Sequence, residues 1–375
     1  MRRGENIRKR KDGRWEARYK VRLGEEAKTC SVYGKTYIEA KRKRQAALLE
    51  QEKFYSGHKP QNQSTTFAEV AQEWLRTCRI RVKQSSFARY EKLVGMHLLP
   101  HLGNVQIRKI TVRLINSMLA QKQEEGRLDG KGGLSAKTVR DIASVLRNIM
   151  QYAYREGYIP HQCCEYALPL LAQKEMRVLS TYEQQKLEKY LQEKEVADNG
   201  NLGILLCLHS GLRIGELCAL KWSDIDLNEG ILRVRHTMQR ISVNDGKQKT
   251  EVVINTPKTR NSVRNIPLSA AILAKLRACE KQHSNSFFLT GTEKHIEPRT
   301  MQLRFGRCLK NIGLPHANFH AIRHTFATRC IEAGFDVKSL SEILGHASVA
   351  FTLNRYVHSS MEHKRAQMDK LALSA

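Results

Sequence analysis

The chain has 375 residues, with 64 Lys+Arg against 37 Asp+Glu, and therefore a formal net charge of +27. At roughly 150 residues per domain, this length predicts two or three domains. A hydrophobic content of 41% is enough for packed cores and argues against wholesale disorder. No run of 18 apolar residues occurs, and no apolar stretch follows the basic N-terminus. We therefore expect neither a transmembrane helix nor a secretory signal.

The surplus of positive charge points to a polyanionic partner, and nucleic acid is the leading one because Lys and Arg neutralise phosphates. A soluble basic protein without such a partner is the plainer alternative. A membrane-surface protein is disfavoured because the charge is spread along the chain. The nine cysteines are scattered and none has zinc-like spacing, so we expect reduced thiols in a cytoplasmic protein.

The N-terminal region is strongly basic, with 18 Lys/Arg against 8 Asp/Glu in residues 1–60. Residues 15–21 alternate with period two and predict a strand, and residues 28–33 predict a second. A capping box, Thr36 to Glu39, predicts a helix that continues to about Phe54. We expect a DNA-binding domain over 1–56, although a basic tail with chance alternation is the alternative. Its expected DNA contacts are Arg8, Lys9, Arg10, Lys11, Arg14, Arg18 and Lys20.

A polar linker at 56–65 leads into a helical region that begins at a second capping box, Thr66 to Glu69. Apolar residues recur at helical spacing, most clearly from Val139 to Ala153. The sequence therefore predicts a four-helix domain over 64–157. Its helices are expected at about 67–78, 85–97, 111–125 and 135–156.

After a proline-containing linker at 157–177, a mainly helical third domain is expected over 174–375, with Ser180 capping its first helix. One interruption, formed by residues 231–235, 251–254 and 263–266, predicts a small antiparallel sheet. The expected fold class is therefore mainly α with small antiparallel sheets.

Several motifs of the third domain could bind a phosphate. Arg213, in GLRIGEL, lies between apolar stretches and is costly to bury unless it meets an anion, although a pair with Glu216 is the simpler explanation. His320 and Arg323, in HAIRHTFAT, share a helix face, and both residue types suit a phosphate.

Three further motifs are weak when taken singly. Lys258 lies in TPKT, where a solvated turn lysine is the alternative. His346 lies in LGHAS, and Tyr356, ten residues later, could equally be a packed aromatic residue.

Taken together and in this order, these motifs resemble the tyrosine recombinase (phage integrase) family over residues 64–375. The first 60 residues are similar to the arm-site DNA-binding domain of lambda-like and conjugative-transposon integrases. The layout is most similar to integrases of conjugative transposons and related prophages. The resemblance implies an arm-binding domain, a helical core-binding domain and a catalytic domain of the tyrosine recombinase/type IB topoisomerase type.

The resemblance also implies a role for each motif residue. Tyr356 matches the nucleophile, which attacks a phosphodiester, forms a 3′-phosphotyrosine and frees a 5′-hydroxyl. Arg213, Arg323 and His346 match the groups that hold the phosphate. His320 matches the general base and acid, and Lys258 the acid for the leaving oxygen. Glu216 matches an accessory acidic position.

These residue types fit that chemistry on physical grounds. Cations aimed at a phosphodiester stabilise the charge of its transition state, and a phenol with a pKa near 10 needs a nearby base. The phosphotyrosine conserves the bond energy, so religation needs no ATP, and the cations make a metal unnecessary. The sequence accordingly shows no P-loop, carboxylate cluster or zinc spacing, and we expect no cofactor.

The expected function is integration and excision of a mobile element in the cytoplasm and nucleoid of a bacterial host. The expected partners are double-stranded DNA at core and arm attachment sites, three further copies in a synaptic tetramer, an excisionase and a host DNA-bending protein. A type IB topoisomerase or telomere resolvase and a silent architectural DNA-binding protein are the alternatives. The tail after Tyr356 either docks on a neighbouring subunit or frays. Its apolar residues are Met361, Met368, Leu371 and Leu373.

Overall fold

The computed structural model divides the chain into two compact units, Met1–Ala172 and Gln173–Ala375. The structure describes residues 6–10, 12–23, 26–57, 64–161, 165–171, 176–193, 198–243, 250–256, 262–279 and 285–356. Within these ranges, no helix combines the length and apolar character needed to cross a membrane. Seven cysteines in the same ranges are free thiols.

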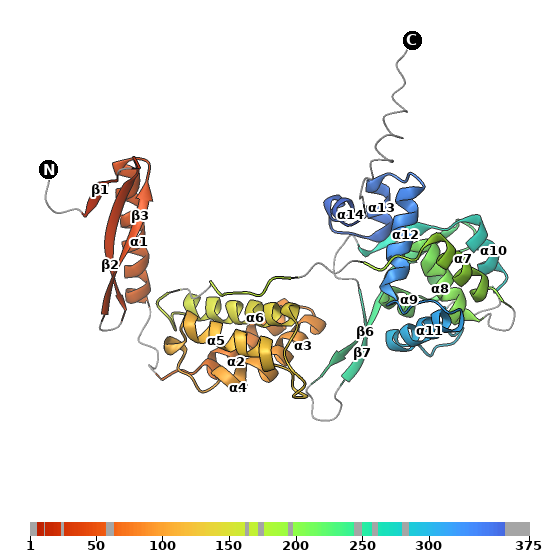
Figure 1. Cartoon of the computed structure of the whole chain (residues 1–375), viewed down its shortest axis with the longest axis horizontal. Coiled ribbons are helices and arrows are strands. Elements are labelled where there is room, and N and C mark those ends of the chain that lie inside the picture. Colours follow the sequence, from red (N-terminus) through yellow and green to blue (C-terminus); the bar gives the residue numbers. More distant parts are fainter. Residues whose placement is uncertain are drawn as a thin grey trace, which may run out of the picture. The chain divides into compact units, whose positions relative to one another are not determined.

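The N-terminal region is an antiparallel sheet of order β1-β2-β3 with one helix packed on it (Figure 1). The two predicted strands and the helix are confirmed, and the short strand β1 is an addition. Glu39 donates its backbone N–H to the Thr36 hydroxyl, so the helix begins where the sequence predicts. The elements are β1 Ile7–Lys9, β2 Trp15–Leu23, β3 Glu26–Gly34 and α1 Tyr37–Gly57.

The pairing register gives this sheet two different faces. Ile7 opposes Ala17, and Lys9 opposes Trp15, so these residues share the face that packs on α1. Ala17 is fully buried there, and the Trp15 ring meets the Tyr37 ring edge-on at 5.2 Å. The opposite face is polar.

The middle region is helical, as the sequence predicts (Figure 1). The capping box of Thr66 and Glu69 is formed in full. The helix α6 packs against α2, α3 and α5 through the apolar stripe that the sequence predicts, with Ile142, Leu146 and Ile149 completely buried. The elements are α2 Phe67–Arg81, α3 Gln84–Leu93, α4 Leu99–Leu102, α5 Val112–Glu125 and α6 Ala136–Arg155, with a 3-10 turn at Ile107–Lys109.

One predicted helix of this domain, at 85–97, differs in form. After α3 the chain widens into a π-helical turn, Val94–Leu98, and continues directly into α4. Pro100 has no N–H for a regular helical bond, and the N–H of Leu99 reaches back five residues to the Val94 carbonyl. The wider turn carries the helix past the proline without breaking it.

The C-terminal unit is mainly helical around one large core. Its central helix α8 is apolar on every side, and Ile204, Leu206 and Cys207 are completely buried. The helices α7 and α12 pack directly against it. The helices are α7 Thr181–Leu191, α8 Asn199–Ser210, α9 Ile214–Ala219, α10 Ala270–Arg277, α11 Pro298–Asn311, α12 His320–Glu332, α13 Val337–Leu344 and α14 Val349–Tyr356, with a 3-10 turn at Trp222–Asp224.

The predicted single sheet of this unit is wrong in its pairing. The strand β5 pairs with β8, where Leu232 opposes Ile266, whereas β7 pairs with β6 as a separate two-stranded ribbon. The sequence analysis missed β6 because its apolar residues, Met238 and Ile241, do not alternate regularly with polar ones. The strands are β4 Ile225–Asp226, β5 Ile231–Val234, β6 Thr237–Ser242, β7 Thr250–Asn255 and β8 Arg264–Pro267.

Candidate active site

Two helices of the C-terminal unit end at glycines, and their last carbonyls frame the candidate site. Gly211 after α8 has a φ of 66°, and Gly345 after α13 has a φ of 64°. This left-handed conformation suits glycine, and a Cβ at position 211 would lie 2.5 Å from the Phe326 ring. The first glycine of GLRIGEL and the glycine of LGHAS are therefore explained by the helix ends that they form.

Arg323 lies between these two helix ends. Its guanidinium donates to the carbonyls of Gly211 at 2.7 Å and Leu344 at 2.6 Å, and the side chain is 1% exposed. Carbonyls at a helix C-terminus carry partial negative charge and favour a cation. Burial, together with the charge of Arg213, lowers the pKa of Arg323 to about 9. The packing of α12 on α8 thus holds a costly buried cation in one orientation.

Arg213 immediately precedes α9 and lies at the more open side of the same cluster. Its guanidinium donates to Glu216 at 2.7 Å and to the Gly345 carbonyl at 3.2 Å. The predicted Arg213–Glu216 pair therefore forms. The side chain nevertheless stays 34% exposed, so an anion can still reach it.

Glu216 holds a second arginine, Arg264, which the sequence analysis did not identify. Two parallel hydrogen bonds of 3.1 and 2.9 Å join the two side chains, and both are almost fully buried. Burial would raise the pKa of Glu216, but hydrogen bonding and charge from Arg264 and Arg213 outweigh it and lower the pKa. The sequence did contain a signal for Arg264. It lies two residues before the apolar Ile266 in a predicted strand, so both side chains share the inner face.

His346 connects Arg323 to α14. Its Nε2 lies 3.0 Å from the Arg323 guanidinium, and its Nδ1 lies 2.8 Å from the hydroxyl of Thr352. Burial and the charges of Arg323 and Arg213 lower the pKa of His346 to about 3. The ring is therefore neutral at neutral pH.

Tyr356, the last described residue of α14, is 7% exposed and belongs to the same chain as the groups around it. Its hydroxyl lies 2.8 Å from Nδ1 of His324, a residue to which the sequence analysis gave no role. Burial raises the pKa of Tyr356, although the charges of Arg323 and Arg355 oppose that change. Burial and His320 lower the pKa of His324 to about 4, so a neutral imidazole contacts a neutral phenol.

His320 is brought to the edge of this group, whereas Lys258 lies outside the described residues. His320 begins α12, and its ring meets the His324 ring edge-on at 4.5 Å. The groups packed around the ring and the charges of Arg323 and Arg213 lower the pKa of His320. The structure thus places His324 between His320 and the phenol.

The cluster carries an excess of positive charge. Among the described residues it contains three arginines, Arg213, Arg264 and Arg323, against the single carboxylate of Glu216. Two positive charges are left over, and buried cations are favourable only where anions or aligned dipoles meet them. The arrangement is therefore suited to an anionic ligand.

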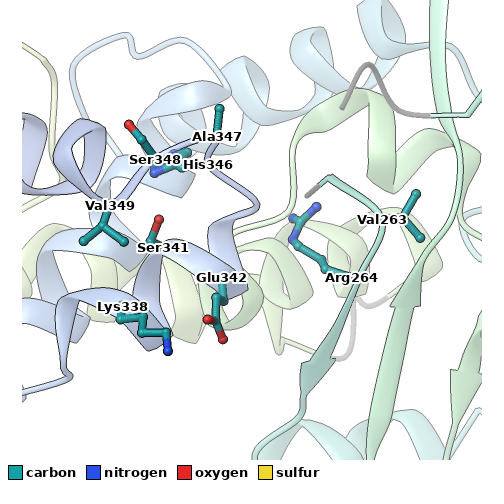
Figure 2. A pocket seen from close by; sticks show the side chains of 9 residues that line it. All are labelled: Val263, Arg264, Lys338, Ser341, Glu342, His346, Ala347, Ser348 and Val349. Atoms are coloured by element: carbon teal, nitrogen blue, oxygen red, sulfur yellow. The ribbon is translucent and has the colours of Figure 1, made fainter. Parts of the chain in front are cut away.

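A pocket opens beside His346 (Figure 2). Val263 and Arg264, at the start of β8, line one side, and α13 and the segment leading into α14 line the other. In the described part of the chain, no group of three or more His, Cys, Asp or Glu side chains is placed to hold a metal ion. The remaining lining residues are Lys338, Ser341, Glu342, His346, Ala347, Ser348 and Val349.

The predicted DNA contacts of the N-terminal region lie on both faces of the sheet. Arg8 opposes Glu16, and Arg18 opposes Ser31, so both arginines lie on the face away from α1, as does Lys20. Arg10 and Arg14 lie over the Tyr33 ring, which belongs to that face. Lys9 lies on the helix side. Lys11 is outside the described residues.

Comparisons with known proteins agree with this geometry. Residues 177–363 match the phage integrase family, and residues 66–120 match the phage integrase N-terminal SAM-like domain. A XerC-like tyrosine recombinase of Caldanaerobacter subterraneus subsp. tengcongensis is 28% identical, with 90% of each chain covered.

Two solved structures share the fold. The Tn1549 transposon integrase bound to a circular intermediate DNA superimposes with a TM-score of 0.67 at 24% identity, covering 82% of this chain and 100% of that one. A lambda integrase tetramer bound to a Holliday junction gives a TM-score of 0.57 at 21% identity, covering 96% and 99%. The fold class and the resemblance inferred from the motifs are confirmed, and the chain belongs to the phage integrase family of tyrosine recombinases.

Proposed function

We propose that this protein integrates and excises a mobile genetic element by cutting and rejoining DNA through a 3′-phosphotyrosine at Tyr356. The observation that carries the proposal is the position of the Tyr356 hydroxyl, which lies within one domain beside a cluster of arginines and histidines with surplus positive charge. A phosphodiester supplies the anion that this cluster lacks.

The arginines stabilise the reacting phosphate. Arg323 is fixed by two carbonyls, and Arg213 remains reachable from solvent. Groups already oriented before the reaction need no rearrangement when charge builds up on the non-bridging oxygens. Glu216 and Arg264 act by holding Arg213 in place.

The proton of the nucleophile has a near acceptor. The Tyr356 oxygen attacks phosphorus, its proton passes to a neutral histidine, and the bond to the 5′-oxygen breaks. In the structure the contacting histidine is His324, with His320 next to it. The assignment of His320 as general base, and of Lys258 as the acid for the leaving oxygen, rests on the family resemblance.

The burial of Tyr356 indicates that this is a resting state. At 7% exposure the phenol is covered, so α14 or its last residue has to shift before the oxygen can reach a phosphate in a duplex. Storage of the nucleophile limits unwanted cleavage, because Tyr356 attacks only after DNA has displaced it.

Duplex DNA is the proposed substrate, bound at core and arm sites by different parts of the chain. The basic face of the N-terminal sheet suits phosphates, and two linked binding modules allow one protein to bridge two sites. The Tn1549 integrase was solved with DNA and lambda integrase as a tetramer on a Holliday junction, which supports a synaptic tetramer here. Action in the bacterial cytoplasm and nucleoid, with an excisionase and a DNA-bending protein as accessory factors, is part of the same proposal.

The proposed reaction uses no metal and no ATP. The arginines supply the positive charge that a metal supplies elsewhere, and the covalent phosphotyrosine conserves the energy of the broken bond. Cleavage should therefore proceed at an unchanged rate in excess EDTA, and a loss of activity that Mg²⁺ restores would refute this part of the proposal.

The decisive experiment uses a nicked half-site oligonucleotide and a denaturing gel. Wild-type protein should give a covalent protein–DNA complex, and Tyr356→Phe should give none while binding the duplex normally. Tyr190→Phe is the matched control, because the Tyr190 hydroxyl accepts a hydrogen bond from Asn311 in the same unit but away from the site. A covalent complex from Tyr356→Phe would disprove the assigned nucleophile. Relaxation of any supercoiled plasmid without site preference would instead indicate a topoisomerase.

A further inference from the structure

The helix that carries the nucleophile is attached to the site by two polar contacts on one face. Thr352 and Tyr356 are four residues apart, so their side chains lie above one another on α14. The Thr352 hydroxyl lies 2.8 Å from Nδ1 of His346, and the Tyr356 hydroxyl lies 2.8 Å from Nδ1 of His324. Thr352 is completely buried.

The contacts of His346 determine its tautomer. An arginine guanidinium only donates hydrogen bonds, so the 3.0 Å contact with Arg323 makes Nε2 of His346 the acceptor. The ring is neutral, because burial and the charges of Arg323, Arg213, Arg264 and His320 disfavour a second proton. Its single proton is therefore on Nδ1, which donates to the Thr352 oxygen.

This resting tautomer is the wrong one for the proposed reaction. To hold a phosphate oxygen, His346 must present an N–H at Nε2, but Nε2 is unprotonated while Arg323 donates to it. When a phosphate takes over the Arg323 donor, the His346 proton has to leave Nδ1 and another has to arrive at Nε2. Nδ1 then needs a donor in place of an acceptor.

We propose that Thr352 is a positioning residue that holds His346 in both of its tautomers, accepting from Nδ1 in the DNA-free protein and donating to Nδ1 when Nε2–H binds the scissile phosphate. A hydroxyl can serve both states because it rotates and is both donor and acceptor. One proton leaves the ring and one is added, through solvent, so the charge of His346 does not change.

The position of Thr352 links this exchange to the nucleophile. Thr352 lies one turn before Tyr356, so a shift of α14 that brings the phenol to the phosphate also moves the Thr352 hydroxyl relative to His346. The phosphate-binding histidine and the nucleophile thus respond to DNA together. This inference rests on the proposed function of His346, but its resting-state part can be tested without DNA.

The first test is spectroscopic and uses the full-length protein labelled with ¹⁵N-histidine. Long-range ¹H–¹⁵N spectra distinguish the two tautomers, and the His346 signal is assigned by its loss in His346→Asn. Wild type, Thr352→Ser and Thr352→Val should all show the Nδ1–H form, because Arg323 still donates to Nε2. In Thr352→Val the Nδ1–H has lost its acceptor, so its proton signal should move upfield and exchange faster with water. The complex of Tyr356→Phe with a half-site should show Nε2–H.

The second test is kinetic and separates positioning from packing. In single-turnover cleavage at saturating protein, Thr352→Val should be slower by about 10- to 100-fold, as is typical when a group that orients a functional histidine is lost. Thr352→Ser should restore the rate. Thr325→Val is the matched control, because Thr325 is equally buried but its hydroxyl bonds to the Leu179 N–H and the Ala321 carbonyl.

The outcomes separate cleanly. The proposal is overturned if the His346 Nδ1–H signal of Thr352→Val matches that of the wild type, if this variant cleaves at the wild-type rate, or if Thr325→Val slows cleavage to the same extent. A wild-type protein that forms no covalent complex would overturn the proposed function itself. The DNA-free spectra would still decide whether the Thr352 hydroxyl accepts a hydrogen bond from Nδ1 of His346.

Discussion

Two glutamates in this chain each hold two arginines, in different surroundings. Glu16, in the N-terminal sheet, accepts from Arg8 and Arg18, and Glu216, in the C-terminal unit, accepts from Arg213 and Arg264. Both glutamates are 3% exposed. The arginine side chains differ, because those of Arg8 and Arg18 are 61% and 45% exposed whereas that of Arg264 is 5% exposed.

This difference suits the Glu16 arrangement to DNA binding and the Glu216 arrangement to catalysis. Glu16 is paired with exposed arginines, which can release it and turn to DNA phosphates at little cost. Glu216 lies in the protein interior, where an arginine that lost its carboxylate would be buried without a partner. The first arrangement allows reversible contacts and the second fixes a geometry.

Glu216→Gln should have the largest effect on stability. It keeps the size of the side chain but leaves Arg264 buried without its charge partner, and breaking such a pair typically costs about 3–5 kcal/mol. Urea unfolding followed by Trp222 fluorescence, in a background with Trp15→Phe and Trp74→Phe, reports on this unit alone. A loss below about 1 kcal/mol would show that the pair is not maintained in solution.

Two further variants sharpen this prediction. Glu183→Gln should change little, because glutamine also completes the capping box of α7. Arg264→Met combined with Glu216→Gln should cost less than the sum of the single variants, because no unpaired buried charge remains between them. Strict additivity would show that the two side chains do not interact.

Arg323→Lys tests whether the planar guanidinium, and not the charge alone, supports the reaction. Lysine cannot reach the Gly211 carbonyl, the Leu344 carbonyl and His346 at once. Cleavage in the half-site assay should fall by about 10²–10³-fold, the loss typical of removing one oriented donor from a transition state.

Arg329→Lys is the control for this change. Arg329 lies on the same helix and donates to the Leu179 carbonyl, away from the phenol. Its cleavage rate should stay near that of the wild type. Equal rates for Arg323→Lys and the wild-type protein would remove Arg323 from the proposed machinery.

Substitutions in the N-terminal sheet should change the affinity for DNA and not the rate of cleavage. Arg18→Ala removes one proposed phosphate contact, so the salt dependence of arm-site binding, log K against log [salt], should flatten by about 0.9. Lys9→Ala is the matched control, because Lys9 lies on the face packed on α1. Equal salt-dependence slopes for the two variants would show that the DNA does not bind the face away from α1. Half-site cleavage should be unchanged in either variant.

The sequence predicts well the features that depend on short-range patterns. The capping boxes at Thr66 and Ser180 form as expected, and the apolar spacing of α6 matches its buried face. The motif order was sufficient to identify the family, and four of the motifs, GLRIGEL, HAIRHTFAT, LGHAS and RY, begin or end a helix at the site. Glycines such as Gly211 and Gly345 mark those ends.

Long-range pairings could not be predicted in the same way. The sequence does not say that β7 pairs with β6 and not with β5, because strand pairing depends on which partners lie nearby in the folded chain. For the same reason, motif analysis named Arg213 and Glu216 but missed Arg264, His324 and Thr352. Arg264 and His324 contact residues distant in sequence, and Thr352 contacts His346 only because the chain turns between α13 and α14.

Glu16→Gln should have the smallest effect and the clearest pH dependence. Hydrogen bonds from Arg8, Arg18 and Ser31 lower the pKa of Glu16 to about 2, against an ordinary value of 4.5. A carboxyl with a lowered pKa in the folded state stabilises above its unfolded pKa, and this contribution is lost as the pH falls toward 2. Wild type should therefore exceed Glu16→Gln in stability at pH 6, and the difference should shrink at pH 3.5. Urea unfolding followed by Trp15 fluorescence, in a background with Trp74→Phe and Trp222→Phe, measures both. If the difference were equal at the two pH values, or as large as that for Glu216→Gln, the two glutamates would hold their arginines in the same way, and the contrast between a releasable and a fixed pair would fail.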